Sequence, residues 1–186
     1  MGTIVDEIMT MLSSGNHIPA ISSSVGGDQT AVTSALGMAM PLLLGAMANH
    51  AATPAGNQML TKTLAQAGTS NPLDNMSGLL SNPAAAGGSG MVDALLGSQA
   101  GTIQNSIAQK TGLPPAAVSQ VMAIAAPIII GHLGTKVSGQ GDLQGLLASH
   151  SKAALDASPD ASALAEQLPA ARQSGVSGML KKFLGQ

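Results

Sequence analysis

The chain has 186 residues, of which 45% are hydrophobic, 1% aromatic and only 9% charged, with a formal net charge of −2. Because an average soluble protein has about 25% charged residues, aliphatic side chains must fill the core here, and small polar residues must cover most of the surface. The acidic balance and the near absence of aromatic rings argue against a nucleic-acid interface, which needs clustered cations or stacking platforms. The absence of cysteine excludes disulfides and thiolate chemistry.

Charge also bears on location and association. Asp6 and Glu7 come early in the chain, and no basic stretch precedes an apolar run as in a secretory signal. We therefore expect a cytoplasmic protein. So few charges give little repulsion between copies, which favours self-association.

The first half of the chain reads as a series of helices. Apolar spacing predicts a helix over residues 2–13, and a short segment around 18–25 follows, interrupted by Pro19. Asp28 is expected to cap a long helix that runs to about residue 50. Start and stop signals then predict a helix over 54–67 and a short one from Asn71-Pro72 to about residue 80.

The second half continues in the same way. We expect helices over residues 90–97, 100–111, 114–135 and 142–155. Two final helices follow, and Pro159 and Pro169 mark their starts. No stretch keeps the strict alternation of a half-buried strand. The predicted class is all-α.

An internal repeat organises these elements. Residues 31–47 recur at 117–133, with pairs such as Ala31/Ala117, Pro41/Pro127 and Gly45/Gly131 at a constant offset of 86. We expect two tandem helical repeats in one compact unit, residues 1–88 and 89–174, with a linker at Ser81 to Gly88. Ser89–Gly97 returns once more as Ser177–Gly185, so residues 175–186 are predicted to be a partial third copy of the repeat-opening helix.

Each long helix has a proline near its middle, Pro41 or Pro127, which predicts a kink. Small residues share one helix face with each proline, namely Gly37 and Gly45 in one copy and Ala123 and Gly131 in the other. We expect the two kinked helices to form the centre of the fold and to cross closely along these small residues. Substituting Gly45 or Gly131 by Leu should then overpack the crossing.

The long helices also raise the question of a membrane span. Residues 113–133 contain no Asp, Glu, Lys or Arg, and about 20 apolar residues suffice to cross a bilayer. Gln120, His132 and two prolines dilute the hydropathy, and no Trp or Tyr marks an interface. Buried central helices are therefore the favoured interpretation, and a span is the alternative.

The sequence contains no recognisable catalytic, cofactor-binding or metal site. The four histidines His17, His50, His132 and His150 have no metal-ligand spacing, and the glycine-rich stretches lack a Walker lysine. His132 is expected to be hydrogen-bonded or at a helix end, and His50 and His150 to close helices. Asp6 and Asp93 are interpreted as matching helix-start carboxylates. We predict a non-enzymatic protein without a cofactor.

The pattern V-x-x-A-x-x-x-A-x-P-L-L-L-G, followed by an Ala-rich turn and the start signal Thr53-Pro54-x-Gly56, resembles a bacterial domain family of unknown function. The YidB-like proteins are related to that family. The match is best from Gly26 to Leu64 and weaker over 89–133, and the terminal Gly-Met-Leu-x-x-x-Leu-Gly is similar to members of the family. The resemblance implies a bacterial helical domain and brings no catalytic residues with it.

These observations predict a self-associating helical structural protein. The extra opening segment, Ser177–Gly185, could pack on a neighbouring chain and give head-to-tail association as a filament or a ring. Alternatively, it could fold back onto its own second half. The second functional hypothesis is a binding module whose apolar groove between the repeats takes a small ligand or a partner helix.

Overall fold

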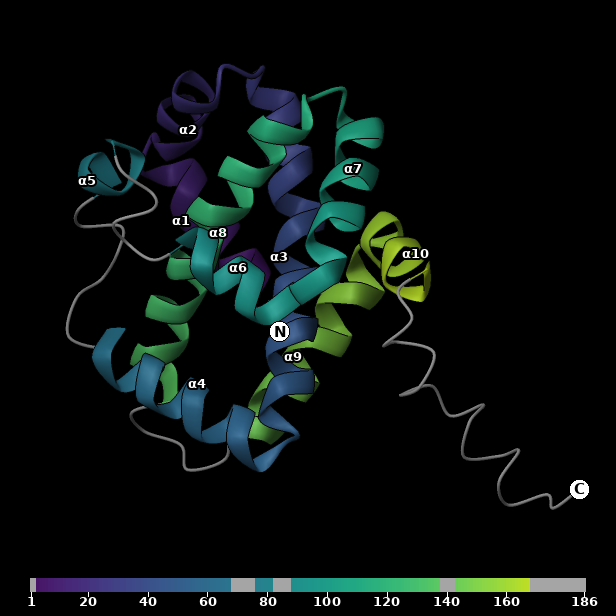
Figure 1. The fold of residues 1–186 in the computed structure, drawn as a ribbon. Helices are drawn as coiled ribbons and strands as arrows, with labels where there is room; N and C mark the ends of the chain where they lie inside the picture. The colour runs from purple at the N-terminus through teal and green to yellow at the C-terminus, as the bar shows by residue number, and fades with distance from the viewer. Residues whose placement is uncertain (1–2, 68–75, 82–87, 138–142, 168–186) are drawn as a thin grey trace, which may run out of the picture.

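The computed structural model describes residues 3–67, 76–81, 88–137 and 143–167 (Figure 1). Every regular element in these ranges is a helix, and none is a strand, which confirms the all-α prediction. The elements in chain order are α1 (Ile4–Ser14), α2 (His17–Val25), α3 (Gln29–Ala51), α4 (Pro54–Ala67), α5 (Met76–Ser81), α6 (Gly88–Leu96), the 3₁₀ turn η1 (Gly97–Gln99), α7 (Ala100–Thr111), α8 (Pro115–Val137), α9 (Leu143–Ala157) and α10 (Pro159–Gln167).

Local start and stop signals explain most of these bounds. Helices α4 and α7 begin and end at the predicted residues. Asp28 caps α3, because its carboxylate accepts hydrogen bonds from the backbone amides of Thr30 and Ala31 at 2.9 and 3.4 Å. The predicted linker at Ser81 to Gly88 is shorter than expected, since Ser81 ends α5 and Gly88 begins α6. Residues 71–75, the rest of that linker and the helix expected at Pro169 lie outside the described residues.

Three local predictions are wrong. His150 does not close a helix but lies in the middle of α9. Pro19 does not interrupt the segment but lies in the first turn of α2. A backbone N–H in the first turn makes no intrahelical hydrogen bond, so proline, which lacks this group, is tolerated there. Asn16, with a left-handed φ of 57°, makes the tight connection from α1. Asp93 lies in the second half of α6 and is exposed, so it is not a helix-start carboxylate. Asp6 does have that role, because it completes a capping box with Thr3 at the start of α1.

The Thr53-Pro54-x-Gly56 signal forms the turn between α3 and α4. The Thr53 hydroxyl donates a hydrogen bond to the carbonyl of His50 at 2.9 Å and accepts one from the amide of Gly56 at 3.2 Å. A Cβ on Gly56 would lie 2.2 Å from the His50 carbonyl oxygen. Only glycine fits this turn without a backbone shift.

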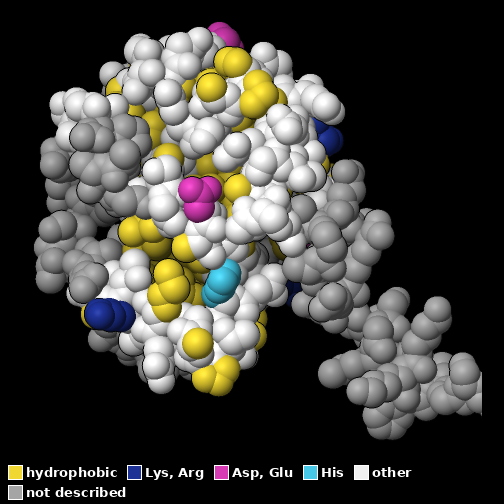
Figure 2. Space-filling view, in the orientation of Figure 1, with side chains coloured by type: hydrophobic (Ala, Val, Ile, Leu, Met, Phe, Trp, Pro, Cys, Tyr) yellow, Lys and Arg dark blue, Asp and Glu magenta, His cyan; other side chains and the backbone are white. Residues whose placement is uncertain are grey.

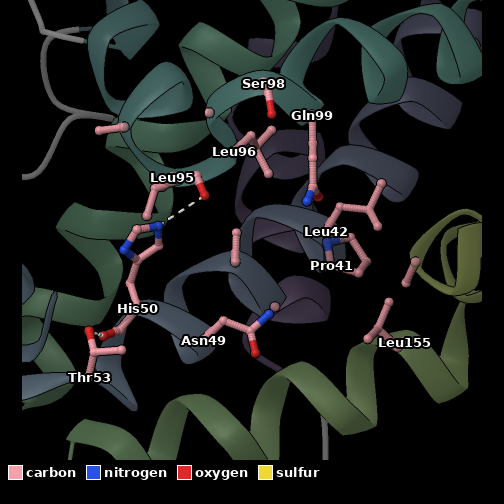
Figure 3. Close-up of a pocket in the computed structure, with 15 residues that line it drawn as sticks. Pro41, Leu42, Asn49, His50, Thr53, Leu95, Leu96, Ser98, Gln99 and Leu155 are labelled. Carbon is pink, nitrogen blue, oxygen red and sulfur yellow. Dashed lines mark hydrogen bonds between the residues drawn. The ribbon is translucent and has the colours of Figure 1, made fainter. Parts of the chain in front are cut away.

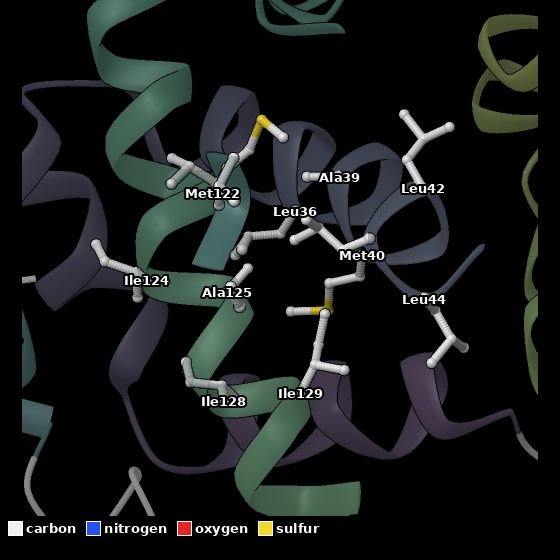
Figure 4. Packing of buried hydrophobic residues seen from close by; sticks show 14 of the residues in the cluster. Leu36, Ala39, Met40, Leu42, Leu44, Met122, Ile124, Ala125, Ile128 and Ile129 are labelled. Atoms are coloured by element: carbon white, nitrogen blue, oxygen red, sulfur yellow. The ribbon is translucent and has the colours of Figure 1, made fainter. Parts of the chain in front are cut away.

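Helices α3 and α8 run through the core and pack against each other. Figure 4 shows Leu36 and Met40 of α3 pointing toward α8, where Met122, Ala125 and Ile129 point back. All five side chains are buried, at most 1% exposed. One buried cluster runs from Ile4 to Leu164 and so includes residues from both halves of the chain. Both helices continue through their internal prolines, Pro41 and Pro127.

The predicted close crossing along small residues is wrong for α3. A Cβ added to Gly37 or to Gly45 would meet no atom within 4 Å, so neither glycine is pressed against another helix. The tight approach in the core is made by α6 instead, where a Cβ on Gly88 would lie 1.8 Å from the Ala123 carbonyl oxygen of α8. Bulky side chains, rather than the glycine face, separate α3 from α8.

The outer helices pack across the two halves. Helix α4, which follows α3, packs against α8, and α9, which follows α8, packs against α3. Helix α6 contacts both central helices. Because of this packing between the two halves, α3, α6, α9 and α10 lie together at one face of the molecule.

The two central helices are long and apolar enough to cross a membrane by length and composition. Inside this fold, however, 61% of the apolar window of α3 and 78% of that of α8 are buried. A core helix satisfies the same test, so length and hydropathy are weak evidence for a span here.

Candidate binding groove

One hollow on the described surface lies where the C-terminal half of α3 meets α6 and η1. Leu155 of α9 and Ala165 of α10 also line it, and Figure 3 labels Leu155 among the lining side chains. We call it the α3–α6 groove; its volume is about 510 Å³. Figure 2 shows hydrophobic side chains in a hollow around a histidine on this face.

The floor of the α3–α6 groove is apolar. It consists mainly of Pro41, Leu42, Gly45, Ala46, Leu95, Leu96, Leu155 and Ala165. Gly45 leaves part of the groove empty, because a Cβ at this position would have nothing within 4 Å. The glycine that was expected to sit in a helix crossing therefore lines an open groove instead.

Polar groups line the rim of the groove. They are Asn49, His50, Thr53, Ser98 and Gln99, and no Lys, Arg, Asp or Glu is among the lining residues. Asp93 is exposed on α6, next to the lining residue Ala94. The groove therefore combines an apolar floor with a neutral rim, and the nearest charge along α6 is negative.

Two side chains of the rim, His50 and Thr53, hold the backbone. The Nε2 atom of His50 lies 3.1 Å from the carbonyl oxygen of Leu95, so Nε2 carries the proton and donates it. This hydrogen bond ties the end of α3 to the end of α6. The Thr53 hydroxyl is used in the turn described above, so it is not paired with a base as a nucleophile would be.

A second polar cluster joins α1 to the end of α8. Glu7 accepts hydrogen bonds from Lys136 at 2.6 Å and from His132 at 2.9 Å. The hydrogen bond from Lys136, together with that from His132, holds the pKa of Glu7 below its usual value. His132 is hydrogen-bonded, as expected, and this cluster connects two elements rather than facing the groove.

None of the described polar clusters has the composition of a metal site. Within the described ranges, no three His, Cys, Asp or Glu side chains are close enough to hold a metal ion. A smaller hollow of about 360 Å³ near Ser24 and Ser119 has no acid, base or cation in its lining. The prediction that the chain has no catalytic or cofactor-binding residues stays a prediction.

Sequence reasoning did not locate the groove. It placed His50 at a helix end, which is confirmed, but gave no signal that His50 meets the end of α6. The useful signal was Gly45, a glycine in the middle of a long helix, which costs stability unless a packing or functional reason keeps it there.

Comparison with known proteins identifies a family but no characterised relative. Neither the curated proteins nor the solved structures gave a match. The model of a bacterial protein family of unknown function, DUF937, matches residues 6–136, which include α3, all but the last residue of α8 and most of the groove. The predicted relation to the YidB-like proteins stays a prediction. With well over half of its length matched, this chain belongs to the DUF937 family.

Proposed function

We propose that this chain is a non-enzymatic cytoplasmic protein that associates with further copies of itself by docking an apolar helix in the α3–α6 groove. The observation that carries the proposal is the groove itself, an apolar hollow of about 510 Å³ between elements from both halves. Helices with an apolar face are recognised in grooves of this kind. The neutral rim imposes no requirement for a charged ligand.

The surface charges favour association between copies. Three of the four described lysines, Lys110, Lys136 and Lys152, are paired with carboxylates of the same chain. Such pairs neutralise each other and leave little net field to keep two copies apart. Exposed pairs contribute little to stability, so their main effect is on the surface potential.

We further propose that the fold is a tandem duplication around two Pro-kinked central helices. Helices α3 and α8 both have 23 residues and begin 86 positions apart, at Gln29 and Pro115. Gly26 and Gly112, also 86 positions apart, both end a helix with a left-handed φ, of 68° and 75°.

A small apolar ligand is the second candidate occupant. The volume of the groove falls within the range of about 300–1,000 Å³ that is common for small-molecule sites, and its lining is mostly apolar with a few polar groups. Native mass spectrometry distinguishes the two candidates. A monomer with a co-purified ligand supports the ligand site, and a concentration-dependent series of oligomers supports self-association.

The test of self-association uses two matched glycine variants of α3. Gly45→Leu fills the groove, whereas Gly37→Leu adds the same side chain at a position outside the groove lining. Both glycines have free space at Cβ, so both variants are expected to fold. The mass from light scattering should rise with concentration for the wild type and for Gly37→Leu, and should stay monomeric for Gly45→Leu. A wild-type chain that is monomeric at every concentration would overturn the proposal.

A further inference from the structure

We infer that within a single copy the α3–α6 groove is occupied by the chain's own C-terminal segment, Ser177–Gly185, and that copies associate by exchanging this segment. The inference rests on the proposed helix-docking function, because it names the helix. Three observations carry it: the apolar pattern of the segment, the place where the described chain ends, and the charge around the groove.

The segment has the apolar pattern of a helix that packs on this core. Ser177–Gly185 repeats Ser89–Gly97, so that Met179, Leu180, Phe183 and Leu184 correspond to Met91, Val92, Leu95 and Leu96 of α6. In α6, Val92 and Leu96 are buried, and Met91 and Leu95 are half-buried. As a helix, the segment would gather its four apolar side chains on one face.

The segment also brings the only aromatic side chain of the chain, Phe183. An aromatic ring is the largest apolar group available to fill a preformed hollow. The two opening helices of the repeats, α1 and α6, already pack on the central helices. A third copy of the opening sequence therefore needs a different apolar site, and the α3–α6 groove provides one.

The described chain ends beside the groove. Helix α10 ends at Gln167, and Ala165 in its last turn lines the groove. Residues 168–176 connect α10 to the segment and can span up to about 30 Å when extended. A segment on a short connection has an effective concentration on the order of millimolar, so at micromolar protein the chain's own segment outcompetes that of a second copy.

The charges are complementary. The segment carries Lys181 and Lys182, and the lining of the groove contains no cation that would repel them. The exposed Asp93 lies on α6, one residue before the lining residue Ala94. At high concentration the same contacts can form between chains, since exchange of an identical element is a low-cost route to oligomers.

The test measures binding of a fluorescently labelled peptide of residues 175–186 to three full-length proteins. These are the wild type, Phe183→Asp, which weakens docking of the attached segment, and Gln186→Asp, which adds the same charge outside the apolar positions. We expect the peptide to bind Phe183→Asp at least ten-fold more tightly than the wild type or Gln186→Asp, whose grooves are already filled. Adding Gly45→Leu to Phe183→Asp should abolish binding, and adding Gly37→Leu should not.

Equal affinity of the wild type and Phe183→Asp would overturn occupancy by the chain's own segment. Absence of binding to all three proteins would overturn the assignment of the segment to the groove, as would binding that Gly45→Leu leaves unchanged. Light scattering on the same samples reports self-association separately. The peptide could bind Phe183→Asp selectively while light scattering shows only monomers. This result would support docking of the segment in its own groove, but it would overturn exchange of the segment between copies and the proposed self-association.

Discussion

Gly27 and Leu113 lie against each other at the point where the two halves of the chain meet. A Cβ on Gly27 would be 2.6 Å from the Cδ2 atom of Leu113, and the two residues are 86 positions apart, which is the offset of the sequence repeat. Under the proposed duplication, these two residues would be equivalent, and a residue that contacts its equivalent would lie close to the axis that relates the two copies. At this contact the small Gly27 leaves the space that the Leu113 side chain fills.

Gly27→Ala is expected to lower the free energy of unfolding by about 1–3 kcal/mol, because the new methyl group must displace Leu113, which is 6% exposed. In a Leu113→Ala background the same substitution should cost less than about 0.5 kcal/mol, since space has been created. Chemical denaturation of the four proteins of this double-mutant cycle measures the coupling. Additive effects would show that the two side-chain positions do not compete for space.

Gly88→Ala is expected to destabilise the fold for a different reason. Its Cβ would meet the backbone of α8 at Ala123, which cannot move as the end of a side chain can, so we expect a loss of about 1–3 kcal/mol. Gly90→Ala in the same helix is the matched control. A Cβ at Gly90 has free space, and replacing a helical glycine by alanine should gain about 0.5–1 kcal/mol. Thermal melts in which Gly88→Ala is as stable as Gly90→Ala would contradict the close approach of α6 to α8.

Sequence reasoning predicted the helices well because their ends depend on local chemistry. The Thr-Pro start of α4 and the glycine that ends α7 act within a few residues, and both helices have the predicted bounds. Pro19 was misjudged because a proline in a first turn and a proline that breaks a helix look alike until the start of the helix is known.

The packing partners could not be predicted in the same way. A face of small residues is compatible with a close helix crossing and with an open groove, and periodicity does not distinguish them. Gly45 lines a groove because α6, α9 and α10 approach α3 at a distance that leaves space, and this depends on residues more than 40 positions away. Likewise, the contact of Glu7 with His132 and Lys136 joins opposite parts of the chain.

The ion pairs of Glu7 with His132 and Lys136 should make the free energy of unfolding depend on pH. Because the pKa of Glu7 in the folded chain is below that of an unfolded chain, its stabilising contribution is present above the unfolded value of about 4.3 and is lost as the pH falls through the folded value. Glu7→Gln should therefore lose stability relative to the wild type at pH 6, by less than about 1 kcal/mol because the side chain is 40% exposed. This difference should shrink between about pH 5 and pH 3.

Urea denaturation of the wild type and Glu7→Gln at several pH values measures this effect. A difference between the wild type and Glu7→Gln that stays constant from pH 6 to pH 3 would rule out a contribution from the ionised carboxylate.

The burial of α3 and α8 predicts that the chain is released from membranes by alkaline carbonate. A bilayer span would have to separate side chains such as Met40 and Met122, both 0% exposed, from their partners in the core. It would also place His132 and Lys136 of α8 near hydrocarbon without Glu7, at a cost of several kcal/mol for an unpaired charge. Carbonate extraction of cell membranes, with an integral membrane protein as the reference, should leave the chain in the supernatant. Its retention in the pellet together with the reference protein would show that the two central helices leave this core and enter the bilayer.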